Sequence, residues 1–237
     1  MSDKISFDNI HDRQNLFADY FQAGTIERVV ENDMRFYKYQ DDDKLYPSIT
    51  TVLAHTGKKD LGFENWLERV GIEEAERIRD ERGRHGTIIH NHIENMILEK
   101  RKLETDNLYV QSLMRPFETA ISQNLTELYA VEQFMISKKL GVAGTVDLVG
   151  KWNDKIAVID WKTSKNLKDY HQITNYFIQG CAYTAMFYEM TGTLCDEIVI
   201  VMGIDGVVRP SIFRVDPNSF IRELMKRIRQ FNKEHMS

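Results

Sequence analysis

Apolar and polar positions follow two different periods along this chain, and the change of period separates helical from strand-like segments. Apolar residues recur at helical spacing in "GTIIHNHIENMILEK", which begins at Gly86. "SITTVLAH" also predicts a short helix, with Ser48 as its N-cap. Further helices are predicted over 7–23, over 62–82 as one or two charged helices, and over 108–128, 171–191 and 216–235.

Strand-like runs fill the middle of the chain. "LYAVEQFMI", "GVAGTVDLVG" and "KIAVIDWKT" are joined by short polar connections, which favours antiparallel hairpins, and "IERVVENDMRFYKY" predicts another hairpin. "EIVIVMGI" is apolar throughout, as in a strand buried on both faces. Pro210 makes "VVRPSIFRV" an edge strand, because proline cannot donate to a ladder. From His85 to Gly203 the predicted order is α-β-β-β-α-β, an α/β fold whose mixed sheet is flanked by helices.

Length and composition predict a single domain with a sizeable core, since the chain has 237 residues of which 42% are hydrophobic. We expect an N-terminal hairpin and helical elaboration over 1–84, and a core with a closing helix over 85–237. The first residues are polar and acidic, unlike a signal peptide, and the longest uncharged run, 170–188, carries polar side chains. We therefore expect a soluble, cytoplasmic protein with no membrane partner.

The charge balance and the cysteine count exclude some classes of function. A net charge of −5 argues against a protein that only coats nucleic acid, but not against an enzyme that gathers acids around a metal. Two cysteines are too few for a four-cysteine zinc site or an iron–sulfur cluster. Basic residues cluster from Arg77 to Arg84, where a solvated helix face is the simpler interpretation.

Two acids and a lysine interrupt the apolar strands. Asp160 and Lys162 share one strand face, separated by roughly 6.6 Å of strand rise, and the short connection lets Asp147 lie across the strand pair from Asp160. Two carboxylates in an apolar sheet repel each other unless a divalent cation such as Mg²⁺ lies between them. A lysine beside such a site can orient a water molecule or stabilise charge on a phosphate. The alternative is an ordinary structural ion pair between Asp160 and Lys162.

Four motifs in order resemble the PD-(D/E)xK nuclease superfamily. They are "GTIIHNHIE", "GVAGTVDLVG", "AVIDWKTSK" and "QGCAY". "YPSITTVL" looks like a segment found near the start of phage members. The similarity is greatest to the RecB-type exonuclease branch, which includes phage exonucleases and the mitochondrial genome maintenance exonuclease. Members of the superfamily that carry an iron–sulfur cluster have four cysteines, so those members are excluded.

The resemblance implies roles for individual residues. His90, Asp147, Asp160 and the backbone around Trp161 would bind one or two Mg²⁺ or Mn²⁺ ions, and Asp147, Asp160 and Lys162 would be catalytic. Supporting roles near the site are implied for Glu94, Glu132, Gln179 and Tyr183. Weaker candidates for DNA binding are Lys165, Lys168, Arg82 and Arg84. For each supporting and DNA-binding candidate, a plain surface or packing role is the alternative.

The implied function is a metal-dependent DNA exonuclease that prefers single-stranded DNA or DNA ends, in phage-type recombination, replication or repair. The helices before His90 would cover the site and guide the strand. Three alternatives stay open. They are a restriction-like endonuclease, a nucleic-acid-binding protein on an inactive nuclease fold, and a structural protein whose acids and lysine form ordinary ion pairs.

Overall fold

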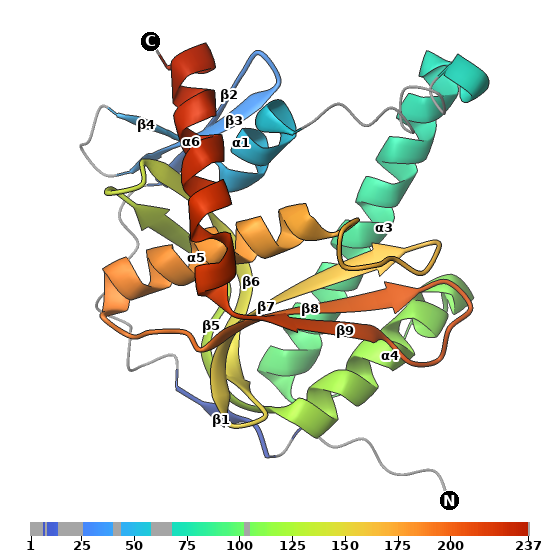
Figure 1. The fold of residues 1–237 in the computed structure, drawn as a ribbon. Helices are drawn as coiled ribbons and strands as arrows, with labels where there is room; N and C mark the ends of the chain where they lie inside the picture. Colours follow the sequence, from blue (N-terminus) through green and yellow to red (C-terminus); the bar gives the residue numbers. More distant parts are fainter. Residues whose placement is uncertain are drawn as a thin grey trace, which may run out of the picture.

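The computed structural model describes residues 7, 9–13, 26–39, 44–57, 68–101 and 105–236 (Figure 1). A six-stranded mixed sheet has the strand order β1-β5-β6-β7-β8-β9. Its strands are β1 (His11–Asp12), β5 (Leu125–Ser137), β6 (Val142–Trp152), β7 (Lys155–Ser164), β8 (Glu197–Ile204) and β9 (Ser211–Val215). The helices are α1 (Ile49–Thr56), α3 (Ile72–Glu99), α4 (Leu108–Asn124), α5 (Thr174–Thr191) and α6 (Ile221–His235), with a 3₁₀ turn η2 (Pro217–Phe220).

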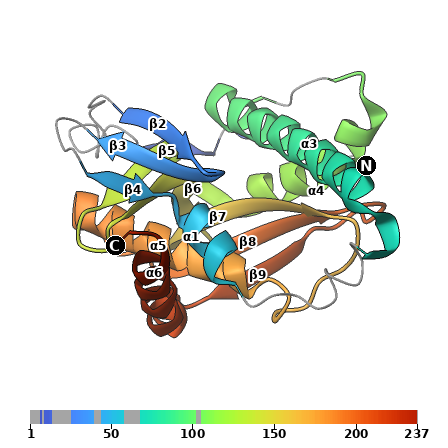
Figure 2. The ribbon, with the colours of Figure 1, turned by 90° about the horizontal axis from the view of Figure 1, so that it is seen from above.

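Helices cover both faces of the sheet (Figure 2). α3 and α4 pack on one face, over a core that includes Ile93, Phe117 and Trp161. α5 packs on the other face with α1 and α6 outside it, over a core that includes Val158 and Phe187. The predicted α/β class and the flanked mixed sheet are confirmed.

The predicted strand pairing is also confirmed. β5, β6 and β7 form an antiparallel meander, and α5 then carries the chain across one face so that β8 pairs parallel to β7. β8 is buried along its whole length, and β9 begins just after Pro210 and lies at the sheet edge. Residue 180 is a glycine because a Cβ there would lie 2.4 Å from Ile198 Cγ2, so only glycine lets α5 approach β8 this closely.

A second sheet of three strands contains the N-terminal hairpin. β2 (Ile26–Glu31), β3 (Met34–Tyr39) and β4 (Leu45–Pro47) pair antiparallel, and Asn32 and Asp33 make the turn with positive φ. Ser48 caps α1 as predicted, since its hydroxyl accepts a hydrogen bond from Thr51 N at 3.0 Å. Ser48 also bridges to Ala143 of β6, which joins the two sheets.

The predicted helix over 7–23 is wrong where the structure describes it. His11 and Asp12 form β1, parallel to β5, and Arg13 N donates to Leu128 O at 2.7 Å. The edge of β5 has backbone groups that need partners, and this pairing satisfies some of them while Ile10 is buried against the core. Residues 14–23 lie outside the described part of the chain.

The N-terminal helices also differ from the prediction. α3 is one helix from Ile72 to Glu99, where separate helices over 62–82 and 86–100 were predicted. It passes through Gly83 and Gly86, and residues 62–67 lie outside the described part of the chain. The division between elaboration and core at residue 84 stays a prediction. α4 ends at Asn124, so the last residues of the helix predicted over 108–128 belong to β5.

No helix in the described ranges combines the length and apolar character needed to cross a membrane.

Candidate metal centre

The two central strands separate at the first acidic residue. β6 and β7 pair from Trp152↔Lys155 to Leu148↔Ile159, and the ladder ends there. Asp147, the next residue of β6, instead accepts a hydrogen bond from Trp161 N through its own carboxylate, at 2.9 Å from Oδ2. A side chain thus satisfies a backbone donor that the ladder leaves unpaired, and the carboxylate of Asp147 stays buried as it does so.

Glu132 of β5 adds a second carboxylate beside Asp147. The flanking pairs Val131↔Leu148 and Gln133↔Val146 set Glu132 opposite Asp147 on the neighbouring strand. Glu132 has a φ of 43°, in the left-handed region that is uncommon for a residue other than glycine. Such backbone strain persists where the surrounding structure holds it, and it is frequent at functional sites. Sequence reasoning placed this residue only in a supporting role, because no sequence signal reveals the backbone conformation.

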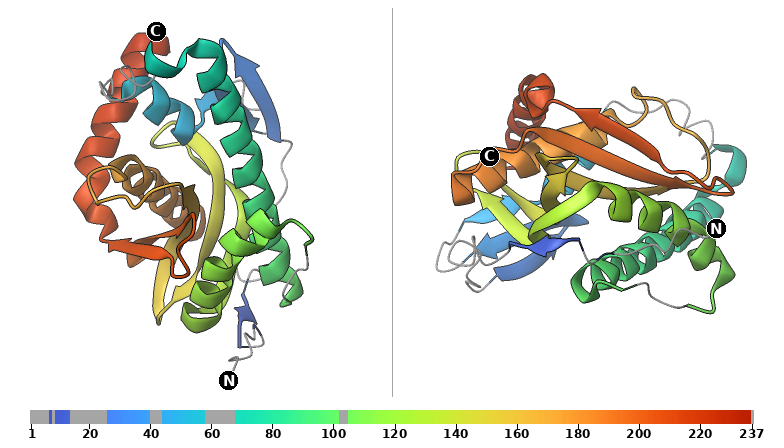
Figure 3. Two further views of the ribbon diagram at one scale, coloured as in Figure 1. Left: turned by 90° about the vertical axis from the view of Figure 1, so that its right-hand side faces the viewer. Right: turned by 90° about the horizontal axis from the view of Figure 1, so that it is seen from below.

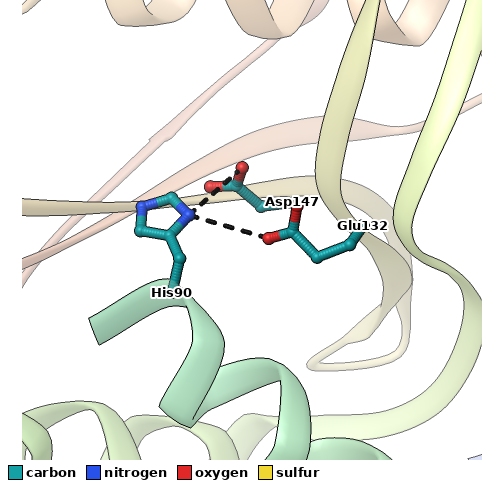
Figure 4. A group of neighbouring side chains, drawn as sticks. All are labelled: His90, Glu132 and Asp147. Atoms are coloured by element: carbon teal, nitrogen blue, oxygen red, sulfur yellow. Dashed lines mark ion pairs between the residues drawn. The ribbon is translucent and has the colours of Figure 1, made fainter. Parts of the chain in front are cut away.

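His90 completes the cluster from the helix side (Figure 4). Its Nδ1 lies 3.7 Å from Glu132 Oε1 and 3.6 Å from Asp147 Oδ1. On α3 the preceding residue, Ile89, is buried in the core, which fixes the rotation of the helix and turns His90 toward the strands. The three ligand atoms all lie within 4.8 Å of one another.

The backbone carbonyl of Trp161 fixes the orientation of the imidazole. His90 Nε2 lies 3.0 Å from this oxygen, and because a carbonyl only accepts, Nε2 must carry the proton. In the neutral ring, Nδ1 then presents its lone pair to the two carboxylates, as a metal-binding histidine does when a carbonyl holds its other nitrogen. The Trp161 backbone therefore contacts the site through both its N–H and its C=O, and its predicted role as a direct metal ligand stays a prediction.

The electrostatics of His90 follow from the same contacts. Burial alone would lower the pKa of the imidazole, but Asp147 and Glu132 outweigh it and raise the pKa of His90 to about 8. Near neutral pH, without an ion, a proton on His90 offsets part of the carboxylate charge. A divalent cation would take over this compensation, because its charge replaces that of the proton.

The donor set suits a hard or borderline divalent ion. Two carboxylate oxygens and one imidazole nitrogen are ligands that Mn²⁺ accepts readily, and oxygen-rich sites suit Mg²⁺. The buried Asp160 supports this fit, because its Oδ2 has no hydrogen bond of regular geometry although it forms an ion pair. The residues present therefore fit a divalent metal ion.

Asp160 and Lys162 form the second half of the site. Lys162 Nζ lies 2.5 Å from Asp160 Oδ2, and Asp160 is 1% exposed, so the carboxylate is almost wholly removed from water. Burial raises the pKa of Asp160 above its usual range, although Lys162 opposes this. Burial lowers the pKa of Lys162, but the negative charges of Asp160 and Asp147 outweigh it and raise the pKa overall. The lysine is therefore an ammonium ion beside the cluster.

α5 presents two of the predicted supporting residues to these strands. Gln179 Nε2 donates to Asp160 Oδ1 at 3.3 Å, a long hydrogen bond. Tyr183, one helical turn further on, is buried against Gly144 of β6, where a Cβ would lie 2.9 Å from its hydroxyl oxygen. Burial, together with Asp147 and Asp160, raises the pKa of the Tyr183 hydroxyl, so the phenol stays protonated.

The remaining candidates lie further from the cluster. Glu94 is partly buried on α3, and burial followed by the charge of Glu132 raises its pKa. Lys165, Lys168 and Arg84 are exposed, while the side chain of Arg82 lies outside the described part of the chain. In the same basic segment, Arg77 pairs with Glu74 and Glu81 on the surface of α3, as expected for a solvated helix face.

Known proteins similar in sequence to this chain include two that are named exonucleases. No protein-family model matches the chain. It is 29% identical to the mitochondrial genome maintenance exonuclease 1 of Homo sapiens over 140 residues, which cover 54% of this chain and 39% of the relative. The protein of the same name from Xenopus tropicalis is 27% identical over 135 residues, covering 52% of this chain and 38% of the relative.

The matched region spans well under half of these relatives' own length. A solved structure of an exonuclease candidate from Eubacterium rectale aligns over 65% of each chain, with a TM-score of 0.46 and 13% identity. At these low identities, the relatives support the resemblance predicted from the motifs, that of a PD-(D/E)xK-like nuclease.

Proposed function

We propose that this chain, a PD-(D/E)xK-like nuclease, is a metal-dependent deoxyribonuclease that hydrolyses phosphodiester bonds. The observation that carries the proposal is the convergence of His90, Glu132 and Asp147 within 4.8 Å of one another. The ion pair of the buried Asp160 with Lys162 adjoins them, so the acidic donor cluster and the Lys162 ammonium group lie side by side. Similarity to proteins named exonucleases supports the same function.

The proposed metal ligands are His90, Glu132, Asp147 and Asp160, for one or two Mg²⁺ or Mn²⁺ ions. Asp160 would bind the ion while it keeps the 3.3 Å hydrogen bond from Gln179, because each carboxylate oxygen has two lone pairs. Trp161 would orient the site rather than bind the ion, because its carbonyl already accepts from both His90 and Lys162. When bound, a divalent ion supplies Lewis-acid polarisation of the phosphoryl group.

The proposed roles of the other groups follow from the reaction. Hydrolysis forms a bond from a water oxygen to phosphorus and breaks the bond to one ester oxygen, which leaves with a proton. The Lys162 ammonium would orient the attacking water and stabilise the negative charge on the phosphoryl oxygens. Gln179 would hold Asp160 in place and Tyr183 would hold the opened strands, while Glu94, whose pKa the charge of Glu132 raises, would add a further carboxyl group beside the cluster.

We further propose that the substrate is single-stranded DNA or a DNA end, cut by an exonuclease in phage-type recombination, replication or repair. The N-terminal half of α3 extends past the sheet (Figures 1 and 3), which supports a role in guiding a strand toward His90. A net charge of −5 argues against a broad groove that grips duplex DNA. The exposed Lys165 and Lys168, which follow β7, would contact phosphates of the DNA backbone.

A matched pair of substrates tests the need for an end. Purified protein and Mg²⁺ are incubated with linear and closed circular single strands of one sequence. The exonuclease predicts loss of the linear strand alone. Equal loss of both would make the protein a restriction-like endonuclease, and binding of both without loss would make it a non-catalytic nucleic-acid-binding protein.

A further inference from the structure

We propose that Tyr176 of α5 is a positioning residue for the catalytic ammonium of Lys162, an inference that rests on the nuclease function proposed above. Lys162 Nζ lies over the face of the Tyr176 ring, 5.1 Å from its centroid. A cation in this position is attracted by the negative face of the aromatic ring, and the attraction is greater where water is excluded. None of the motifs in the sequence pointed to this residue.

The ammonium has contacts of three different kinds. Asp160 Oδ2 lies 2.5 Å away as an ion-pair partner, Trp161 O accepts a hydrogen bond at 3.3 Å, and the Tyr176 ring covers a further side. A lysine side chain has four rotatable bonds, so one contact would leave the ammonium free to take several positions. Three contacts from a strand carboxylate, a strand carbonyl and a helix ring define one position.

The Tyr176 ring takes no part in the proposed metal site, whereas the two oxygen atoms that contact Lys162 do. Asp160 is a proposed metal ligand, and a carboxylate that binds an ion has less charge to offer the lysine. The Trp161 carbonyl also accepts from His90, at 3.0 Å. The ring face of Tyr176 has no such competing partner in the proposed metal site. It would therefore hold Lys162 in place when the site is loaded, which is when the lysine is needed.

The helix places Tyr176 for this role. Tyr176, Gln179 and Tyr183 are spaced i, i+3 and i+7, so they share one face of α5. The same face supplies the Gln179 contact to Asp160 and the Tyr183 contact to Gly144. Tyr176 is partly buried and packs against the core beneath α5, which limits the freedom of the ring. One helix face thus contacts the catalytic strands at successive points.

Two variants separate the ring from the hydroxyl. Tyr176→Phe keeps the aromatic face, whereas Tyr176→Leu keeps an apolar side chain for the core but removes the face. Tyr188→Leu is the matched control, because Tyr188 lies on the same helix, is 49% exposed, and has no contact with the metal site in the described structure. Thermal unfolding of all three checks that the fold is kept.

The first readout needs no activity. Protons above an aromatic ring are shielded, so the ε-methylene signal of Lys162 should lie upfield of the other lysines in metal-free protein labelled at lysine. Lys162→Met assigns the signal by removing it. The signal should persist in Tyr176→Phe and in Tyr188→Leu, and move to the main lysine region in Tyr176→Leu. An unshifted Lys162 signal in the native protein would overturn the geometry.

The second readout is the rate of DNA hydrolysis at saturating Mg²⁺. Tyr176→Leu should lower kcat by roughly 3- to 30-fold, the effect of losing one cation–π contact in the transition state. Tyr176→Phe and Tyr188→Leu should stay within about twofold of the native rate, because a cation–π contact does not need the hydroxyl. Mn²⁺ affinity, measured by calorimetry, should not change in any variant.

The outcomes separate this inference from the proposed function. A shielded Lys162 signal with an unchanged kcat in Tyr176→Leu would overturn the positioning role and leave the nuclease function intact. Equal losses of kcat in Tyr176→Leu and Tyr176→Phe would show that the hydroxyl matters and the ring face does not. This result would also overturn the positioning role of the ring. A native protein that cuts no DNA in Mg²⁺ would overturn the nuclease function and with it any catalytic role of Tyr176, while the shielded signal would still establish the contact.

Discussion

Asp147 Oδ2 accepts a hydrogen bond from the backbone N–H of Trp161 at 2.9 Å, at the point where β6 and β7 cease to pair. The other carboxylate oxygen of Asp147 faces His90 Nδ1 at 3.6 Å. One aspartate thus connects the opening of the strands with the donor cluster. The negative charge of Asp147 contributes to the donor cluster, whereas its hydrogen bond from Trp161 N–H stabilises the fold.

Asp147→Asn should separate these two contributions. The asparagine oxygen can still accept from Trp161 N–H, so the fold should persist, but one charge of the metal site is lost. We expect DNA hydrolysis in Mg²⁺ to fall by at least about 100-fold. In chelator the melting temperature should stay equal or rise, because fewer carboxylates then repel one another.

Asp154→Asn is the control for this change. Asp154 lies in the exposed β6–β7 turn with a φ of 66°, which asparagine tolerates. Its rate and melting temperature should match the native protein. A nearly native rate for Asp147→Asn would remove Asp147 from the proposed site.

His90→Ala should weaken metal binding more than DNA binding. The imidazole supplies one of three converging ligand atoms, so Mn²⁺ affinity should fall by about tenfold or more. Calorimetric titration with Mn²⁺ measures this, and His92→Ala, two residues along the same helix and outside the cluster, is the matched control. If His90→Ala and His92→Ala bound Mn²⁺ equally well, His90 would be an ordinary helix residue.

The raised pKa of His90 predicts a pH-dependent stability for the metal-free protein. Its pKa of about 8 lies above the ordinary 6.5, so protonated His90 stabilises the folded state. This contribution is fully present below pH 6.5 and is lost as the pH rises through about 8. It amounts to about 2 kcal/mol at most.

Urea unfolding of the native protein and His90→Asn in chelator tests this, at pH 6 and at pH 9. The native protein should be the more stable at the lower pH, and the difference between the two proteins should shrink at the higher pH. An equal difference at both pH values would contradict the assigned electrostatics.

Two glycine substitutions test the packing that brings α5 to the sheet. Gly180→Ala would place a Cβ 2.4 Å from Ile198 Cγ2, which should lower the free energy of unfolding by about 1–3 kcal/mol. Gly86→Ala, in α3, meets no atom within 4 Å and should raise that free energy by about 0.5–1 kcal/mol, because alanine favours the helix. Chemical denaturation measures both; equal effects of the two substitutions would refute the close packing.

The sequence predicted the parts of the fold that depend on local patterns. The meander from β5 to β7 followed from alternation and short polar connections, and the Ser48 cap followed from residue type. The neighbouring positions of Asp147 and Asp160 on paired strands followed from the short connection between these strands. These features depend on residues that are close together along the chain, so the sequence alone is enough to predict them.

The features that the sequence did not reveal depend on distant contacts. α3 continues through Gly83 and Gly86 although glycine disfavours helices, because its C-terminal half is anchored in the core. β1 forms because the edge of β5 offers backbone partners to His11 and Asp12. Sequence patterns also carry no signal for backbone conformation or for contacts far along the chain.

The site shows the same limit. The left-handed backbone of Glu132 brings its carboxylate to His90, and the Trp161 carbonyl accepts from a histidine that is 71 residues away in sequence. The resemblance suggested each residue individually. Which nitrogen of His90 faces the carboxylates, and which strand atom holds the ring, came only from the three-dimensional arrangement.

The dependence of DNA hydrolysis on a divalent ion tests the central claim most directly. Single-stranded linear DNA, labelled at one end, is incubated with the purified protein in excess chelator, and then again after Mg²⁺ or Mn²⁺ is restored. We predict no hydrolysis in chelator and full recovery with either ion for the native protein, whereas Asp147→Asn should recover about a hundredth of the native rate or less. Hydrolysis at an undiminished rate in excess chelator would contradict the metal mechanism built on His90, Glu132 and Asp147.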